Sequence, residues 1–384
     1  LLMEKAEKER ETIAWAEPSK EVMQLIDLIP PQPGFRFVGL PEQPELYPEN
    51  MYQLSSDGQS LKAVRTGTVY PNPQFAETNE QIVVNGKEEV VSIPYYLDQE
   101  GRKYSISAHM WYLQKDEAID RALLMSKLDP LGAARVLYAF AQAYEGYNPT
   151  VDRVGGDNHI NFSQSKLSGP PFAYWGGVWN RWWYNDLMTL RPLMTAFAYI
   201  KRTNAFELLS EEAGIDVEAY VVEKMFKPSA EFVKTYVHRY SNMSFQPWRG
   251  MIALAKVLED PDLVHYVVEH VERFASSLFM LDGFWQEVTL SYHNQTTAGL
   301  ANLVQELQGW SDPPGYVSPR TGKRFDNLDL SAEYPIVARA LQVSQQLAYA
   351  DGKVLPIMDT WASEKAAEPP SEGPMLLPGA KVGR

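Results

Sequence analysis

The stretch that decides the fold is residues 118–144, AIDRALLMSKLDPLGAARVLYAFAQAY. Its apolar residues recur every three to four positions, which is the spacing of one face of an α-helix. Pro130 has no N–H to continue the ladder of a preceding helix, so the stretch predicts two helices that meet near this proline. The apolar face comprises Ile119, Leu123, Leu124, Leu131, Ala134, Leu137, Tyr138, Ala141 and Tyr144.

The same periodicity continues toward the end of the chain. It predicts helices over residues 187–202, 217–240, 248–258, 262–278, 289–307 and 330–349. No strands alternate with these segments and no repeat of fixed period is present, so antiparallel helix hairpins are favoured over a regular solenoid. The predicted fold class is therefore mainly α, an α/α toroid built as an incomplete barrel of antiparallel helix hairpins.

The N-terminal part follows a different pattern. A helix is expected from Glu4 to Leu28, ended by Pro30, and an irregular region rich in Pro, Asn and Gly follows it. Within that region, residues 81–86 and 89–93 flank the turn signal Asn85-Gly86 and predict a β-hairpin. The expected organisation is an N-terminal helix and irregular arm with short strands over 1–105, a toroid domain over 106–361, and a linker over 362–384.

Composition excludes several classes of function. The chain of 384 residues has no cysteine, which excludes thiol nucleophiles and cysteine-based zinc sites. A net charge of −14 argues against nucleic-acid and membrane-surface partners. No apolar run reaches the ~18 residues of a membrane-spanning helix. The 10 Trp and 21 Tyr gather in clusters, and flat rings with a polar edge suit the faces of sugars.

The densest group of chemically useful residues is 282–295, DGFWQEVTLSYHNQ. A glycine turn and an aromatic pair lead to an acid, and a Ser-Tyr-His triplet then opens a helix. Tyr292 neighbours Gln295 and Thr296 at helical spacing, near a helix start whose partial positive charge favours an anionic ligand. A purely structural interpretation stays open, in which this is a helix N-terminus with a buried tyrosine and a hydrogen-bonded histidine.

This segment resembles the Asp-Gly-aromatic, Glu and Ser-Tyr-His motif of heparinase II/III-like polysaccharide lyases and related alginate lyases. Residues 94–113 resemble the entry to the first toroid helix of that family. Residues 351–360 resemble its DG-x-L-P-x-x-G-D loop, with Met358 in place of the usual glycine. The resemblance covers roughly residues 94–384, through scattered motifs.

The resemblance implies a reaction and candidate catalytic residues. These lyases cleave uronate polysaccharides by β-elimination, with the tyrosine of the motif as proton carrier, so Tyr292 and the adjacent His293 are the candidates here. The residue that neutralises the uronate carboxylate corresponds to Asn242, which alternatively caps a helix that begins near Ser244. Relatives place a histidine where this chain has Met243, so the separate base is left open. The expected substrate contacts of this region are Gln246, Trp248, Arg249 and Glu287.

A second aromatic cluster spans residues 174–186. Rings can stack on sugar faces and an arginine can bind a carboxylate with two hydrogen bonds, so Trp179, Asn180, Arg181 and Tyr184 are further candidate substrate contacts. Half of the rings in this cluster are expected to pack inward instead. The polar loop 155–161 adds His159 as a candidate.

The expected partner is thus an anionic polysaccharide or oligosaccharide, with no nucleic acid and no membrane. No cofactor and no catalytic metal are expected, while a structural divalent cation is left open. The resemblance also implies a C-terminal β-sandwich partner domain and an extracellular or periplasmic location. Two alternatives remain, a glycoside hydrolase on the same toroid and a catalytically inactive carbohydrate-binding module. A hydrolase would need a pair of carboxylates, for which Asp157, Asp186 and Glu287 are available.

Overall fold

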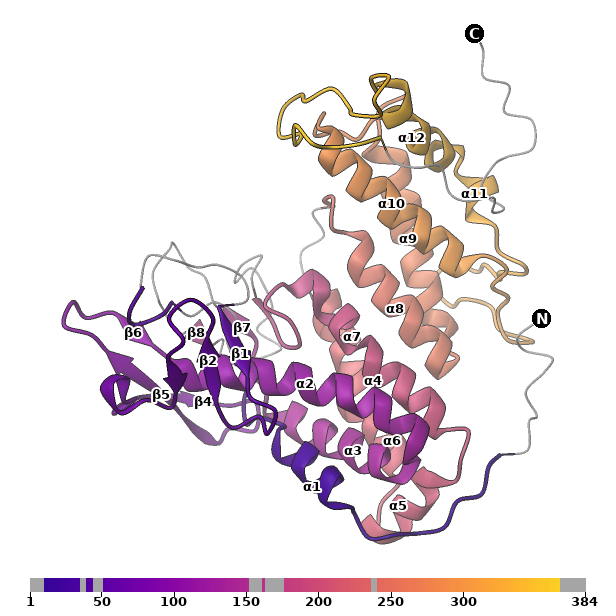
Figure 1. The fold of residues 1–384 in the computed structure, drawn as a ribbon. Coiled ribbons are helices and arrows are strands. Elements are labelled where there is room, and N and C mark those ends of the chain that lie inside the picture. Colours follow the sequence, from indigo (N-terminus) through magenta and orange to yellow (C-terminus); the bar gives the residue numbers. More distant parts are fainter. Residues whose placement is uncertain are drawn as a thin grey trace. The chain divides into compact units, whose positions relative to one another are not determined.

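The computed structural model describes residues 10–34, 39–43, 51–151, 161–162, 176–235 and 240–366. The chain divides into two compact units, residues 1–237 and residues 238–384. Helices are the main regular structure of both units, and small antiparallel sheets belong to the first (Figure 1). The predicted mainly-α class is therefore confirmed, whereas the domain boundaries expected near residues 105 and 361 stay predictions.

The two longest helices of the first unit are the pair that residues 118–144 predict. The side chain of Asp129 accepts a hydrogen bond from the amide of Gly132 at 2.8 Å, and Pro130 is the first residue of the second helix. This N-cap and proline confirm the predicted division. The helices are α2 (Ile106–Leu128), α3 (Pro130–Gly146), α4 (Asp186–Ile200), α5 (Ala205–Ala213), α6 (Val217–Val221) and α7 (Lys227–Lys234).

Two of these helices differ from the sequence-based expectation. The helix predicted over 217–240 is interrupted by a π-helical turn, Val222–Phe226, and α7 ends at Lys234. Pro228 lies just beyond this turn and lacks an N–H, which accounts for the local shift of the hydrogen-bond ladder. Helix α5 was not predicted, because it is short and lies between loop residues, ending at Gly214 with φ 69°.

The first helix, α1 (Lys20–Asp27), is shorter than expected. The hydroxyl of Ser19 accepts a hydrogen bond from the amide of Val22 at 3.2 Å and so caps its N-terminus, with Pro18 immediately before the cap. The predicted helix start at Glu4 is therefore wrong for residues 10–19, which are not helical. Residues 1–9 lie outside the described part of the chain.

The strands of the first unit form three-stranded antiparallel sheets. In the β4–β5 pair, Val84 lies opposite Val90 across the turn at Asn85 and Gly86, so the predicted hairpin is confirmed. The strands are β1 (Tyr52–Leu54), β2 (Leu61–Ala63), β3 (Val69–Tyr70), β4 (Asn79–Val84), β5 (Val90–Leu97), β6 (Lys103–Tyr104), β7 (Thr150–Val151), β8 (Asn161–Phe162) and β9 (Gly176–Gly177).

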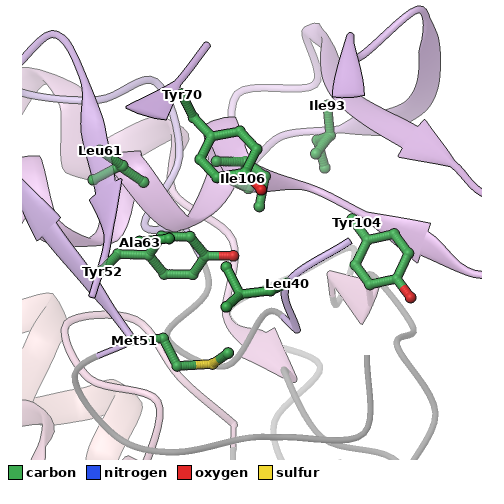
Figure 2. Close-up of a cluster of buried hydrophobic side chains, with 10 residues drawn as sticks. Leu40, Met51, Tyr52, Leu61, Ala63, Tyr70, Ile93, Tyr104 and Ile106 are labelled. Atoms are coloured by element: carbon green, nitrogen blue, oxygen red, sulfur yellow. The ribbon is translucent and has the colours of Figure 1, made fainter. Parts of the chain in front are cut away.

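A hydrophobic cluster joins the first sheets to the start of α2. Tyr52, Leu61 and Tyr70 from β1–β3 meet Ile93 from β5 and Ile106 from α2, all at most 5% exposed (Figure 2). Burial of side chains of this size contributes about 1.5–3 kcal/mol each, so the cluster ties the strands firmly to the helix.

The second unit consists of helices α8 (Phe245–Leu258), α9 (Pro261–Ser277), α10 (Leu290–Leu307), α11 (Leu330–Glu333) and α12 (Pro335–Gln346). Helix α10 packs against both α8 and α12. The helix expected over 330–349 is divided at Pro335, since the residue before a proline is disfavoured in helical backbone.

Residues 347–366 fold back onto this helical group. Val354 is buried with Phe284, Leu290 and Val343, and the bridge between Ala348 and Val354 closes a tight turn. The segment that follows α12 therefore packs against the N-terminal end of α10.

Candidate active site at the start of helix α10

Helix α10 receives its N-terminal cap from a distant segment. Its own N-cap residue, Thr289, makes no side-chain capping bond. The amide of Leu290 instead donates to the hydroxyl of Thr360 at 2.9 Å. The hydroxyl of Ser291 accepts a hydrogen bond from the amide of Trp361 at 3.0 Å. The segment 347–366 thus completes the first turn of α10.

Glu364 accepts hydrogen bonds from two residues of α10, one before and one after Tyr292 in the sequence. Its carboxylate accepts from the hydroxyl of Ser291 at 3.2 Å and from the amide nitrogen of Asn294 at 3.0 Å. The linker that the sequence predicts over 362–384 gives no sign of this contact. A carboxylate near a helix N-terminus also interacts favourably with the helix dipole. No local pattern signals a partner some 70 positions away.

Tyr292 lies on the first turn of α10 with 38% of its surface exposed. The structural interpretation that placed a buried tyrosine here is therefore wrong for this residue. Gln295 and Thr296 follow one turn later on the same side of the helix. Gln295 is exposed, whereas the Thr296 hydroxyl is buried and donates to the backbone carbonyl of Tyr292 at 2.7 Å.

Asn242 lies in the turn before α8 and reaches the same face of α10. Its amide nitrogen Nδ2 donates to Oε1 of Gln295 at 3.0 Å. The N-cap of α8 is Ser244, whose hydroxyl accepts a hydrogen bond from the amide of Ser241 at 2.8 Å. Asn242 therefore does not cap the helix, and its side chain is directed to the residue one turn beyond Tyr292.

Close packing of α8 on α10 brings this turn near Tyr292. A Cβ atom at Gly299 would lie 2.3 Å from the ring of Phe245, the first residue of α8. Gly299 is two turns beyond Tyr292, on the same side of α10. The absence of a side chain at this position is what allows the N-terminal end of α8, and Asn242 before it, to approach.

His293 does not belong to the accessible site. It is fully buried and its ring stacks on Phe284 at 5.1 Å between centroids. Nδ1 accepts from the amide of Trp285 at 3.1 Å, and Nε2 lies 2.8 Å from the carbonyl of Ala340, to which it donates in the neutral tautomer. Desolvation lowers the pKa of His293. Both ring nitrogens of His293 are thus engaged inside the core, and its predicted catalytic role stays a prediction.

The predicted contacts on α8 have different environments. Trp248 is 3% exposed and its ring stacks on His270, so it lies in the core, and its substrate contact stays a prediction. Arg249 donates to one oxygen of Glu306 from two nitrogens, at 2.7 and 3.1 Å, so its charge is already paired. Gln246 is half-buried, and its buried Oε1 has no hydrogen-bond partner among the described residues.

Glu287 is exposed near the start of α10, as a substrate contact would require. Its carboxylate accepts a hydrogen bond from the indole nitrogen of Trp285 at 2.7 Å. Trp285 itself is fully buried, so this bond satisfies its N–H at the edge of the core. Glu287 thus has a structural partner and an accessible carboxylate.

In the first unit, the predicted aromatic loop is organised around a buried carboxylate. Asp186, at the start of α4, accepts from the backbone amides of Val178, Trp179 and Asn180 at 2.8–3.1 Å. Burial raises its pKa to about 7, while the three amide donors and nearby Lys115 act in the opposite direction. Gly177 is required here, because a Cβ would lie 2.0 Å from the carbonyl oxygen of Asn180.

This loop turns predicted sugar contacts inward. Trp179 is fully buried, stacks on Tyr144 at 5.2 Å and donates its indole N–H to Ser229 at 2.8 Å. Tyr184 is 2% exposed. Both rings lie in the core, in line with the expectation that half of the rings pack inward, and their substrate contacts stay predictions.

The polar members of the loop are also engaged. The amide nitrogen of Asn180 donates to the hydroxyl of Thr189 at 2.9 Å, and Asn180 is half-buried. Arg181 is 6% exposed, with its guanidinium 4.0 Å from the ring centre of Trp182. Its predicted carboxylate contact would need this side chain to leave a buried position. His159 and Asp157 lie outside the described residues.

No family model, no curated protein and no solved structure matches the chain. Among the described residues, no group of three or more His, Cys, Asp or Glu side chains could hold a metal ion. In the same part of the chain, no helix is long and apolar enough to cross a membrane.

Proposed function

We propose that the chain is a polysaccharide lyase that cleaves a uronic-acid-containing polysaccharide by β-elimination. The observation that carries this proposal is the hydrogen bond from Asn242 to Gln295, one helical turn beyond the exposed Tyr292. A proton carrier and an amide donor thereby share one face at a helix N-terminus. β-Elimination next to a carboxylate needs such a pair, a group that moves a proton and a donor that stabilises negative charge.

Asn242 would bind the carboxylate of the uronate. Its amide nitrogen carries two protons, and the bond to Gln295 uses one of them. The other can donate to a carboxylate oxygen, and this bond becomes stronger as the enolate develops. Gln246, four residues further along the chain from Asn242, is kept as a proposed substrate contact, although its Oε1 is buried.

Tyr292 would carry the proton in both halves of the reaction. As a tyrosinate it takes the proton from C5, and the electrons of that C–H bond form the C4–C5 double bond. The bond between C4 and O4 then breaks, and the proton passes to O4 of the departing sugar. The tyrosinate is regenerated, and no external base is required.

The turns of the resembled motifs also support the proposal. Gly283 has φ 93°, and a Cβ there would lie 2.9 Å from the amide nitrogen of Ala340. Met358, where the resembled family has glycine, adopts φ 50°. Left-handed backbone favours glycine, so φ 50° at Met358 fits a position that is glycine in the resembled motif.

The finer features of the sequence-based hypothesis belong to the same proposal. We place the helices in an α/α toroid, assign a C-terminal β-sandwich partner domain and an extracellular or periplasmic location, and expect no cofactor. Tyr292, Asn242, Gln246 and Glu287 remain as substrate-facing residues. A structural divalent cation stays compatible with this scheme.

The test is a panel of uronate polymers incubated with the chain, with the ultraviolet absorbance of the unsaturated sugar product as readout. Heparan, hyaluronan, chondroitin, alginate and bacterial exopolysaccharides cover the main uronate contexts. The ultraviolet absorbance is expected to increase during incubation with at least one of these polymers. Cleavage without absorbance would instead indicate a glycoside hydrolase.

A carbohydrate-binding module without catalysis is the second candidate. Both ring nitrogens of His293 form hydrogen bonds within the core, so this histidine cannot assist Tyr292 in moving a proton. This favours a module without catalysis. Binding of a polymer without product, unchanged in Tyr292→Phe, would support this candidate over the lyase.

A further inference from the structure

The first unit contains a pocket that the proposed reaction does not use. It has a volume of about 450 Å³ and lies among β2, β3, the 3-10 turn Pro73–Phe75 and the N-terminal turn of α2. Pockets of small molecules typically measure about 300–1,000 Å³, so this one has room for a small ligand.

The floor of the pocket is the hydrophobic cluster of the first unit. Leu61, Tyr70 and Ile106 line it and are nearly fully buried (Figure 2). The hydroxyl of Tyr70 donates to Glu42 at 2.6 Å. Phe75 and Met110, both half-buried, form further walls. The ring of Phe75 packs edge-on against Tyr96 at 5.6 Å, which holds it in place.

Among the described residues that line the pocket, Glu77 has the one charged side chain. It accepts from the amide of Ser107 at 3.2 Å and also from the Ser107 hydroxyl. Burial raises its pKa, although the bonds from Ser107 act against this. Within the described residues Glu77 forms no ion pair, and neither lysine nor arginine lines the pocket.

We propose that this pocket binds a small organic cation with an apolar body, its ammonium group beside Glu77 and its body against Phe75 and Met110. The negative charge of the Glu77 carboxylate pairs with the positive ammonium group of the ligand. Aromatic faces attract cations as well as apolar groups. A small anion such as a free uronate would meet a carboxylate and no base. The site is thus independent of the lyase proposal and differs from it in ligand charge.

The experiment is a calorimetric titration of the full chain with benzylammonium, with benzyl alcohol as the neutral probe of the same shape. Benzylammonium is expected to bind at least about tenfold more tightly than the alcohol, because the alcohol lacks the ionic contact. Added salt should weaken benzylammonium binding and leave the alcohol unaffected.

Two variants separate charge from shape. Glu77→Gln retains an acceptor for the Ser107 amide and should lower benzylammonium affinity about tenfold, to the level of the alcohol. Glu80→Gln makes the same change of net charge outside the pocket lining and should leave binding unchanged. Ala76→Phe places a ring at an exposed lining position with ordinary backbone, φ −61°, and should block both probes while Glu77 is intact.

Equal affinity for the two probes, or unchanged binding in Glu77→Gln, would overturn the proposal. Absence of benzylammonium binding to the unmodified chain would also overturn it. If Glu77→Gln fails to fold, the probe comparison, the salt dependence and Ala76→Phe still decide the outcome.

Discussion

At the scale of residues, Tyr292 and His293 are adjacent in the chain and have opposite environments. Successive residues on a helix point about 100° apart, so one ring faces outward and the next faces the core. The sequence predicts the helix start from the Ser-Tyr-His triplet. It does not predict which residue is buried, because that depends on the partners Trp285 and Ala340, which other segments provide.

His293 makes stability depend on pH in a defined direction. Burial lowers its pKa in the folded state, so the unfolded chain binds a proton that the folded chain does not. Its stabilisation is complete above the unfolded value of 6.5 and is lost as pH falls below that value toward the folded one.

His293→Phe should lower the free energy of unfolding by about 1–3 kcal/mol at neutral pH, because the buried Trp285 amide loses its acceptor. Urea unfolding of both proteins at several pH values tests this. The difference between them should shrink as pH falls from about 7 to 5, by at most ~1.4 kcal/mol per pH unit. Contributions from other groups, such as Asp312, cancel in the difference. A gap that widens on acidification would contradict the assignment.

Met358 provides a backbone test at the same scale. Its φ of 50° costs a side-chain-bearing residue about 1 kcal/mol, and its side chain is 77% exposed. Met358→Gly should therefore raise the melting temperature slightly or leave it unchanged, whereas Met358→Val should lower it. The reverse order would mean that this turn is not left-handed in solution.

At the scale of elements, the site depends on how α8 approaches α10 and on how the segment 347–366 caps α10. Neither contact follows from helical periodicity. The periodicity predicts both helices, but the missing Cβ at Gly299 determines how closely they pack, and Thr360 and Glu364 complete the first turn from far along the chain. The Tyr292 motif was therefore predictable, and its supporting contacts were not.

Gly299→Ala tests the packing of α8 on α10. The added Cβ would overlap the Phe245 ring, so the variant should lose about 1–3 kcal/mol of stability. Any lyase activity should fall with it, since Asn242 precedes Phe245 by only three residues. Ala301→Gly, on a neighbouring turn of the same helix, is the control for backbone entropy and should cost about 0.5–1 kcal/mol. Equal effects of the two changes on activity would argue against a special role of the α8 contact.

At the scale of the whole molecule, the sequence predicts a mainly helical chain, and most helices lie where periodicity places them. The exceptions have local causes. Three of the expected helices are shortened or divided by prolines, which are Pro18, Pro228 and Pro335. Helix α5 is too short to show a clear pattern. The aromatic loop was harder to predict, because composition alone does not show that Asp186 draws its backbone inward.

The net charge of the whole molecule determines how the KM for an anionic polymer should depend on salt. A net charge of −14 repels an anionic polymer at long range, and salt screens that repulsion. Moderate salt should therefore lower KM for a uronate polymer or leave it unchanged, as measured by initial rates at several ionic strengths. A KM that rises steeply with salt would indicate a basic binding surface that the present site lacks.

The most direct test of the central claim compares Tyr292→Phe with Tyr349→Phe in the lyase assay. Tyr349 is another exposed tyrosine of the same unit, so the pair removes one hydroxyl from similar surroundings. Loss of the proton carrier should lower kcat by about 10²–10⁴ in Tyr292→Phe, with folding intact, while Tyr349→Phe keeps full activity. Full activity in Tyr292→Phe would contradict the account.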